Sequence, residues 1–384
     1  MIEFEQEYLA TQIPVARAKV LGVGGAGTNT VNEMLKEDYS NVDFIVANTD
    51  AQVLLKSDAP LKIQLGSKST RGLGAGANPE IGKRAAEEDL DKIREYLSDA
   101  DVVFLTAGLG GGTGSGALPV IARTLKERGI LSIAVVTMPF TFEGKRRMNI
   151  ANNALEALRK EIDTLIVIPN QKLLQIADQQ VSLVNAFGII NQLINKFVRA
   201  IADILGKPGH INVDFADLTA ITRNMGFAVM GIGQANGPTR AQDAAHQATQ
   251  SPLLENFNIK GAKGILLNIT GNSKLGLHEV SAASEVIYQQ AHEDANIIIG
   301  SVIDESYGDE ITVTLIATGL SHQKENLDAN QVNVTPTFRD STVLRSPTVS
   351  LEPRLEQSSI NSGELEVPAI LRRYHREKES FQKS

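Results

Sequence analysis

The chain has 384 residues, 42% of them hydrophobic and 21% charged, a size and balance that fit two packed domains with some unstructured sequence. It contains no cysteine, and its six histidines show no HExxH spacing, so disulfides, thiolate zinc sites and cysteine nucleophiles are excluded. A formal net charge of −8 argues against a dedicated nucleic-acid surface, because phosphate binding depends on clustered Lys and Arg.

Short apolar runs alternate with helical patterns through the first half of the chain. They predict buried strands at Ala18–Val23, Asp43–Ala47, Asp101–Thr106, Leu131–Thr137 and Thr164–Ile168. Strands that alternate with helices are typical of a parallel sheet covered on both faces. We therefore expect a doubly wound α/β domain over residues 17–180, after a flexible extension at 1–16. Ligands on such sheets bind at the carboxyl ends of the strands.

A long helix follows this domain. Between Val181 and Leu205 apolar residues recur at three- and four-residue steps, which predicts a heavily buried central helix over residues 181–205. Beyond it, strands are predicted at Gly264–Thr270, Ile297–Val302 and Ile311–Ala317, with a helix around Val280–Ala291. These elements predict a smaller α/β domain over residues 206–320.

The composition changes after Leu320. Ser, Thr, Asn, Gln and Pro dominate as far as Gly363 without an apolar period, which predicts a disordered linker over residues 321–363. In residues 364–384, apolar side chains surround a proline and lead into arginines. This pattern is typical of a docking peptide that folds on a partner, and a frayed terminus is the alternative. The candidate partner-binding residues are Leu365, Val367, Pro368, Ile370, Leu371 and Arg372.

The strongest chemical signal is the glycine-rich segment Gly108–Gly116, which directly follows a predicted strand and precedes a helix predicted at Ala117–Arg128. Glycines let the backbone approach an anion closely, and a helix N-terminus adds partial positive charge, so this loop is suited to phosphates. No lysine follows the glycines, so it is not a Walker loop. Amides, the hydroxyls of Thr113 and Ser115 and a metal ion would have to neutralise the phosphate charge.

Two further loops are glycine-rich. Gly22–Gly27 matches GxGxxG between the first strand and the first helix, which is typical of dinucleotide-binding oxidoreductases. That alternative expects an acid at the end of the second strand; Asn48 stands there and Asp50 follows two residues later, so the alternative stays open. The third loop is Arg71–Pro79. Three such loops exceed what one pyrophosphate needs and fit a triphosphate better.

Together these loops resemble the FtsZ and tubulin family, whose GGGTG[ST]G signature stands here as Gly110–Gly116. The resemblance covers roughly Ala16 to Leu320 and includes Thr137–Gly144, Ile168–Asn170 and Asn212–Asp217. It implies a tubulin-like GTPase that assembles into filaments of the bacterial division ring and hydrolyses GTP between successive subunits. The implied cofactors are GTP or GDP and Mg²⁺, with the metal bound mainly through the phosphates.

Carried over position by position, the resemblance implies phosphate contacts from the glycine loops, ribose contacts from Glu143 and Arg147, and base contacts from Asn170 and Phe187. The GTP-binding residues that it implies are Gly24, Gly25, Asn29, Asn48, Ala75, Gly76, Gly108, Gly110, Gly111, Gly112, Thr113, Gly114, Ser115, Gly116, Glu143, Arg147, Asn170, Phe187, Asn191 and Gln192.

One position departs from the family pattern. Where members usually carry Asn-Asp on the central helix, this chain has Asn191-Gln192. A carboxylate would accept from both the N1 and N2 hydrogens of guanine, whereas a neutral amide has one acceptor oxygen. The substitution predicts weaker discrimination of guanine from other bases at Gln192.

Asp214 and Asp217 follow the central helix three residues apart. Alone, such a pair is typical of an N-cap with a neighbouring carboxylate. The resemblance implies instead that both residues, with Asn212, meet the γ-phosphate held by the next subunit and are catalytic. A filament protein that binds nucleotide without hydrolysing it would have no use for this pair, and tubulin itself would imply a longer chain with an acidic tail.

No apolar run approaches the roughly 20 residues that span a bilayer, and the first residues lack the pattern of a secretory signal. We therefore expect a cytoplasmic protein, concentrated at the division site beneath the inner membrane. Its expected partners are further copies of itself and, through residues 364–384, membrane-tethering and regulatory division proteins. Membrane contact would then be indirect, and no nucleic acid is expected.

Overall fold

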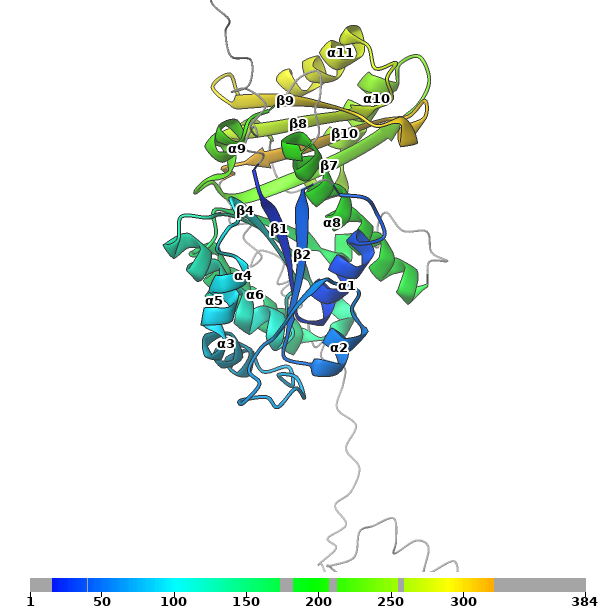
Figure 1. Cartoon of the computed structure of the whole chain (residues 1–384). Coiled ribbons are helices and arrows are strands. Elements are labelled where there is room, and N and C mark those ends of the chain that lie inside the picture. The colour runs from blue at the N-terminus through cyan, green and yellow to red at the C-terminus, as the bar shows by residue number, and fades with distance from the viewer. Residues whose placement is uncertain (1–15, 40, 173–181, 207–212, 255–258, 321–384) are drawn as a thin grey trace, which may run out of the picture. The chain divides into compact units, whose positions relative to one another are not determined.

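The computed structural model describes residues 16–39, 41–172, 182–206, 213–254 and 259–320, which belong to one compact unit. Within these ranges, ten strands form one sheet in the order β3-β2-β1-β4-β5-β6-β7-β10-β8-β9 (Figure 1). The strands are β1 (Ala18–Val23), β2 (Val42–Asn48), β3 (Leu61–Gln64), β4 (Val102–Gly108), β5 (Leu131–Met138), β6 (Thr164–Pro169), β7 (Gly226–Ala235), β8 (Gly264–Gly271), β9 (Asn296–Ile303) and β10 (Ile311–Thr318).

The first seven strands are parallel, and only β10 runs against its two neighbours, β7 and β8. All eight predicted strands are confirmed, with no end shifted by more than two residues. Sequence reasoning missed β3, which has four residues, and β7, whose sequence GFAVMGIGQA is interrupted by glycines. Both lack the continuous apolar run that predicts a buried strand.

Helices cover both faces of the parallel part of the sheet (Figure 1). Alternate strand residues point to opposite faces, so in β1 Val20 packs with α1 and the central helix while Leu21 packs with the helices of the other face. On the first face lie α1 (Gly24–Met34) and α2 (Ala51–Lys56); on the second lie α3 (Pro79–Glu88), α4 (Leu90–Tyr96), α5 (Thr113–Glu127) and α6 (Lys145–Arg159). This confirms the predicted doubly wound α/β arrangement.

The predicted central helix is confirmed as α8, Leu183–Gly206. Phe197 and Ile201 are buried in one hydrophobic core that also contains Val20 of β1 and Leu266 of β8. The helix therefore packs against both halves of the sheet. The strands β1 and β2 run down the view in Figure 1, whereas β8, β9 and β10 run across it, because strand twist accumulates over the sheet.

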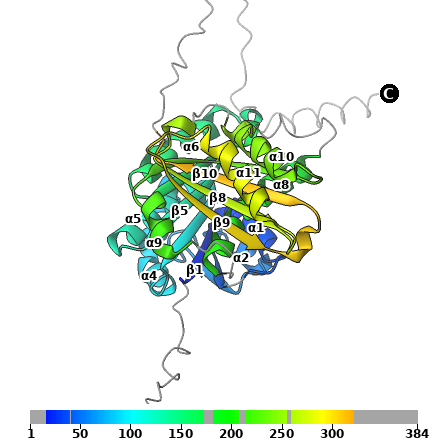
Figure 2. The same cartoon turned by 90° about the horizontal axis from the view of Figure 1, so that it is seen from above.

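The last strands have their own outer layer. It consists of α10 (Arg240–Thr249), which packs on β7 and β10, and α11 (Leu277–Tyr288), which lies beside α10 (Figure 2). Ala244 and Ala283 are fully buried in a core with Val229 and Leu267. Helix α9 (Phe215–Thr222) lies beside the start of β8, where Ile221 contacts Gly264.

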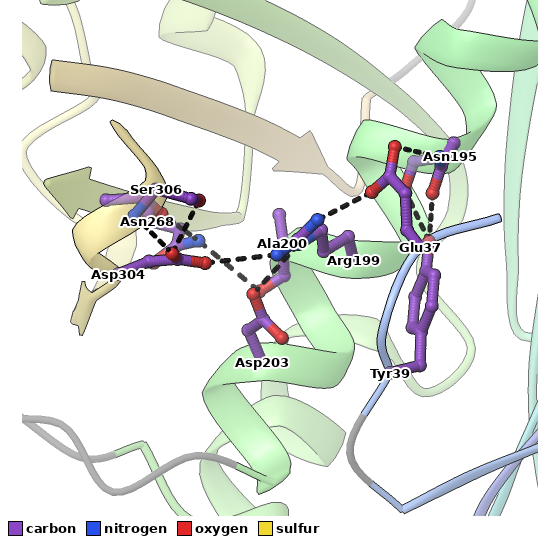
Figure 3. A network of polar contacts seen from close by, with 10 residues as sticks. Glu37, Tyr39, Asn195, Arg199, Ala200, Asp203, Asn268, Asp304 and Ser306 are labelled. Atoms are coloured by element: carbon purple, nitrogen blue, oxygen red, sulfur yellow. Dashed lines mark hydrogen bonds and ion pairs between the residues drawn. The ribbon is translucent and has the colours of Figure 1, made fainter. Parts of the chain in front are cut away.

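A polar network ties α8 to segments far apart in the sequence (Figure 3). The Arg199 guanidinium donates to Glu37, after α1, over 2.6 Å and to Asp304, after β9, over 3.0 Å, and it lies 3.4 Å from Asp203. Tyr39 donates to Asn195. Burial, together with the charge of Glu37, raises the pKa of the Tyr39 hydroxyl far above its ordinary value, because both disfavour the charged phenolate.

Some sequence predictions concern parts of the chain outside the described residues. These are the extension at 1–16 except Ala16, the linker at 321–363 and the segment 364–384 with its partner-binding residues. The division into two α/β domains at residues 180 and 206 stays a prediction. In the described part of the chain, no helix is long and apolar enough to cross a membrane.

Candidate functional site

The switch point of the sheet lies between the parallel neighbours β1 and β4. From their carboxyl ends the chain turns to opposite faces, into α1 and α5. In open α/β sheets, the crevice that binds ligands opens at this point. The loops Gly22–Gly27 and Gly108–Gly116 adjoin here, since a Cβ placed on Gly24 would lie 3.1 Å from the Gly114 nitrogen.

Both helices that start at the switch point leave their first N–H groups without a side-chain cap. Neither cap residue, Val23 or Gly112, provides a capping bond, and neither first turn contains an acidic residue. Uncapped N–H groups at the positive end of a helix dipole form a site for an anion. The prediction that the second helix starts at Ala117 is wrong, because Thr113–Gly116 is the first turn of α5.

The glycines of these loops fall into two groups. One group permits close packing: a Cβ on Gly27 would lie 2.4 Å from the Thr106 carbonyl oxygen, and one on Gly116 would lie 2.0 Å from that of Pro79. In the other group a Cβ would meet nothing within 4 Å; it includes Gly25, Gly76 and Gly111. The second group leaves room for a ligand, whereas the first holds the helices against the sheet and against one another.

The two hydroxyls predicted to contact phosphate already make bonds within the protein. Ser115 Oγ accepts from the Gly110 amide over 2.9 Å, and Thr113 Oγ1 lies 2.6 Å from Thr49 Oγ1. These contacts fix the shape of the loop. A serine that accepts a hydrogen bond still has its own proton to donate, so the Ser115 contact is compatible with phosphate binding.

A cavity of about 220 Å³ opens beside the glycine loops. It is lined by residues from α1, from the ends of β4 and β5, from the residue after β6 and from α8. The lining includes five predicted binding residues, namely Asn29, Gly108, Asn170, Phe187 and Asn191.

Two polar atoms in the cavity wall, Thr106 Oγ1 and Asn170 Oδ1, are buried and have no hydrogen-bond partner among the described residues. Asn48 Nδ2, at the end of β2, is a third buried atom of this kind. Leaving such an atom without a partner costs free energy, and a polar ligand can remove that cost. Asn170 is thus placed to accept a hydrogen bond from a ring nitrogen or an amino group.

Phe187 is held by an aromatic neighbour while remaining accessible. Its ring makes an edge contact with buried Phe140, with centroids 5.6 Å apart and planes at 83°, yet 41% of Phe187 is exposed. Phe140 in turn stacks on Phe142 over 4.9 Å. A ring that is oriented but partly open can stack on a flat ligand.

Glu143 and Arg147 form an ion pair at the start of α6, and Glu143 Oε1 also accepts from the Phe140 amide over 2.9 Å. A Cβ on Gly110 would lie 3.0 Å from the Arg147 carbonyl oxygen. The pair therefore lies beside the Gly108–Gly116 loop rather than in the cavity lining.

The third loop, between β3 and α3, lies on the other side of the same segment. A Cβ on Gly112 would be 2.8 Å from the Ala75 Cβ, so the predicted contacts Ala75 and Gly76 lie next to the glycine loop. Asp50, which kept the oxidoreductase alternative open, instead caps α2: its Oδ1 accepts from the amides of Gln52 and Val53. The carboxylate of Asp50 is therefore explained by helix capping, without a bound ribose.

The structure does not bring Gln192 to the cavity. Asn191 lines it and accepts from Thr30 over 2.9 Å, whereas Gln192 lines a separate groove of about 420 Å³ between α8, β7 and α10. Consecutive helical residues point about 100° apart, so only one of the pair can face the cavity. The resemblance placed both residues at the nucleotide and attached the discrimination of guanine to Gln192, because the rotation of the helix is not visible in the sequence.

Asp214 and Asp217 lie together and exposed at the start of α9, where Asp214 Oδ1 accepts from the Asp217 amide over 2.6 Å. The other end of α9 reaches the amino ends of the parallel strands: Arg223 donates to the Gly129 carbonyl, just before β5. The Gly226 amide likewise donates to Asp163, just before β6. The pair is thus on the edge of the sheet opposite the glycine loops. Asn212 is outside the described residues.

Within the described ranges, no group of three or more His, Asp or Glu side chains could hold a metal ion. A cation at this site would therefore be bound by oxygens other than those of a carboxylate cluster. Mg²⁺ keeps several waters and is commonly bound through substrate phosphates with one or two protein groups. The uncapped helix starts and the hydroxyls of α5 are compatible with that arrangement.

Comparison with known proteins identifies this geometry. Residues 17–178 match the model of the tubulin/FtsZ family GTPase domain, and residues 226–321 match that of the FtsZ family C-terminal domain. The chain is 48% identical to the cell division protein FtsZ of Pseudomonas aeruginosa over 355 residues, which cover 92% of this chain and 88% of the relative. The chain belongs to the FtsZ family. Its first half is accordingly a GTPase domain.

Solved structures of FtsZ agree with this. An empty FtsZ dimer from M. jannaschii superimposes with a TM-score of 0.77 at 42% identity, covering 80% of this chain and 89% of that one. The CetZ2 protein of Haloferax volcanii shares the fold at 20% identity, with a TM-score of 0.67 over 80% of this chain and 94% of that one. The family and the capping role of Asp50 together argue against the oxidoreductase alternative.

Because Asn191 lines the cavity, we expect base selectivity to depend on Asn191 and not on Gln192. In this FtsZ family member, Asn191→Asp should raise the preference for GTP over ITP about ten-fold, because a carboxylate accepts from both N1–H and the N2 amino group that inosine lacks. It also keeps the acceptor for Thr30. Gln192→Asp makes the same change in the neighbouring groove and should leave the ratio unchanged. Competition binding with GTP and ITP measures this affinity ratio. A change in the ratio caused by Gln192→Asp and not by Asn191→Asp would contradict the assignment of the base contact to Asn191.

Proposed function

We propose that this chain is a self-assembling GTPase of the bacterial division ring, in which the glycine loops of one subunit and the Asp214 edge of the next together form the catalytic site. The observation that best supports a shared site is that the glycine loops and Asp214 lie on opposite edges of the sheet within one chain. Gly24 and Gly108 lie at the carboxyl ends of parallel strands, and Asp214 begins a helix tied to the amino ends. The six-residue strand β6, at about 3.3 Å per residue, keeps the edges roughly 20 Å apart.

Head-to-tail assembly would bring the two edges together. The amides and helix starts of one subunit would hold the triphosphate, while Asp214 and Asp217 of the next would orient and polarise the attacking water. Catalysis would then require polymer. Loss of the γ-phosphate removes one of the groups that join the subunits, which gives the filament a limited lifetime.

The proposed nucleotide is GTP, converted to GDP. The unpaired acceptor of Asn170 suits a guanine N–H, Phe187 would stack near the base, and Asn191 would complete the contact. Mg²⁺ would be bound mainly through the phosphates, where it neutralises charge that develops during transfer. No lysine contributes to the Gly108–Gly116 loop, so the amides and the cation would share that work.

The proposed partners are further copies of the chain and, through Leu365–Arg372, membrane-tethering and regulatory division proteins. Self-association is supported by the solved relative described as an FtsZ dimer. The tail contact rests on sequence alone, because these residues are outside the described part of the chain. On this proposal the protein works in the cytoplasm at the division site beneath the inner membrane, and it meets the membrane only through partners.

Hydrolysis of GTP per subunit, measured against protein concentration with pelleting in parallel, tests the shared site. We expect turnover to appear only above a threshold concentration, together with polymer, because a single subunit carries only half of the machinery. Turnover per subunit that stays constant at every concentration would contradict a shared site. Binding of NADH in place of GTP would instead favour the oxidoreductase alternative.

A further inference from the structure

The loop between β3 and α3, residues 65–78, has a backbone conformation that it would not keep unaided. Five residues between 71 and 77 have positive φ: Arg71, Gly72, Gly74, Gly76 and Ala77. Two of them, Arg71 and Ala77, carry a Cβ, and a left-handed conformation costs such residues about 1 kcal/mol or more each. Contacts outside the loop must therefore hold its shape.

Those contacts come from the C-terminal end of α3. Glu88 Oε1 accepts from the Lys68 amide over 2.7 Å, and its Oε2 accepts from the Ser69 amide over 3.1 Å. The buried Asp89 accepts from the Gly66 amide over 2.7 Å. The bonds from Lys68, and with them those from Ser69, hold the pKa of the Glu88 carboxyl below its ordinary value, because they favour its charged form.

The other end of the loop is attached to the same helix. Asn78 caps α3 by accepting from the Glu80 amide over 3.1 Å, and the Asn78 amide donates to the Ala75 carbonyl over 3.0 Å. The beginning of the loop is thus tied to the C-terminal end of α3, and the end of the loop runs into the N-terminus of the same helix. Its middle is tied to the end of β2, where the Gly74 amide donates to the Thr49 carbonyl over 3.1 Å.

The helix that holds the loop also holds the phosphate segment. A Cβ on Gly82 of α3 would lie 2.2 Å from the Gly112 carbonyl oxygen, so the two backbones are in direct contact. Ala75 lies against Gly112 from the loop side. No atom of the described residues lies within 4 Å of a Cβ placed on Gly76, which leaves that backbone open to a ligand. Helix α3 therefore sets the distance between Ala75–Gly76 and the glycine loop.

We infer that Glu88, assisted by Asp89, is a positioning residue for the terminal phosphate of the nucleotide: by binding the amides of Lys68 and Ser69 it holds the loop so that Ala75 and Gly76 face that phosphate. This inference rests on the proposed GTP site. It assigns the loop to the γ-phosphate because the α5 and α1 helix starts already adjoin at the switch point, while the loop lies beyond Gly112. A loosened loop should therefore weaken the binding of a nucleoside triphosphate more than the binding of a diphosphate.

Glu88→Ala removes both acceptors, and Glu88→Gln removes one of them. At protein concentrations below assembly, we expect Glu88→Ala to weaken GTPγS binding roughly five-fold, Glu88→Gln by less, and GDP binding to be unchanged, in keeping with the modest strength of exposed carboxylate contacts. Glu87→Ala is the matched control, since Glu87 is the adjacent exposed glutamate of α3 and should change neither affinity. Hydrogen exchange should accelerate at the Lys68 and Ser69 amides in Glu88→Ala and stay unchanged in Glu87→Ala.

The binding measurements test the proposed GTP site and the positioning role of Glu88 separately. A parent chain that binds neither GTPγS nor GDP would overturn the proposed function itself. A parent that binds both, with Glu88→Ala either unchanged or weakened equally for both, would overturn the positioning role of Glu88 and leave the GTP site intact. Equal weakening with a lowered unfolding midpoint would identify Glu88 as merely structural.

Discussion

Replacing Asp214 with asparagine should reduce GTP turnover at least about a hundred-fold while leaving GTP binding, assembly and stability close to those of the parent. Asparagine caps a helix as well as aspartate does, so the bond from the Asp217 amide survives and only the negative charge is lost. A catalytic carboxylate that polarises water cannot be replaced by a neutral amide. The measurement is steady-state hydrolysis of GTP above the assembly threshold, normalised to pelleted polymer.

The same variant distinguishes the two roles of Asp214 that the structure allows. If the residue were only a helix cap, Asp214→Asn would hydrolyse GTP like the parent, and Asp214→Ala would lower the unfolding midpoint and turnover together. Asp91→Asn, which removes an exposed acid of α4, controls for the change in net charge and should leave turnover unaffected. Normal turnover by Asp214→Asn would therefore refute the proposed role.

The sequence predicted the fold because its signals are local. Runs such as Ala18–Val23 and Leu131–Thr137 are apolar on both faces, as a strand covered by helices on each side must be, and their alternation with helices determines a doubly wound sheet. What it could not predict was the junction in the middle. The short contact of β6 with β7, Thr164–Ile166 with Gly226–Ala228, joins all ten strands into one sheet, and no local pattern marks it.

The candidate site was predictable to the extent that its chemistry resides in single residues. Asn170 and Phe187 were found from a motif and from the resemblance, and the structure places both in the cavity. Side-chain direction was not predictable: it separates Asn191 from Gln192 by the rotation of one helical step. Nor does the sequence separate a glycine such as Gly116, which packs against Pro79, from Gly111, which faces open space.

The second large effect concerns stability: Arg199→Met should lower the free energy of unfolding by about 3 kcal/mol, because it removes the cation that three carboxylates share inside the molecule. Glu37 and Asp304 approach Arg199 from opposite ends of the sequence, and Asp203 lies one turn along α8 (Figure 3). The Arg199 side chain is only 19% exposed, so in the variant water would screen the repulsion among the three carboxylates poorly. Urea unfolding of the nucleotide-free protein measures the change.

Arg123→Met is the matched control, because it removes an arginine whose side chain is 54% exposed and forms an ion pair with Glu161 at 3.3 Å. An exposed pair of this kind contributes less than about 1 kcal/mol, so the difference between the two variants isolates the effect of enclosure. Adding Glu37→Gln to Arg199→Met should recover part of the loss, since it removes one of the mutually repelling carboxylates. Equal unfolding midpoints for Arg199→Met and Arg123→Met would show that the network does not hold α8 between the two halves of the sheet.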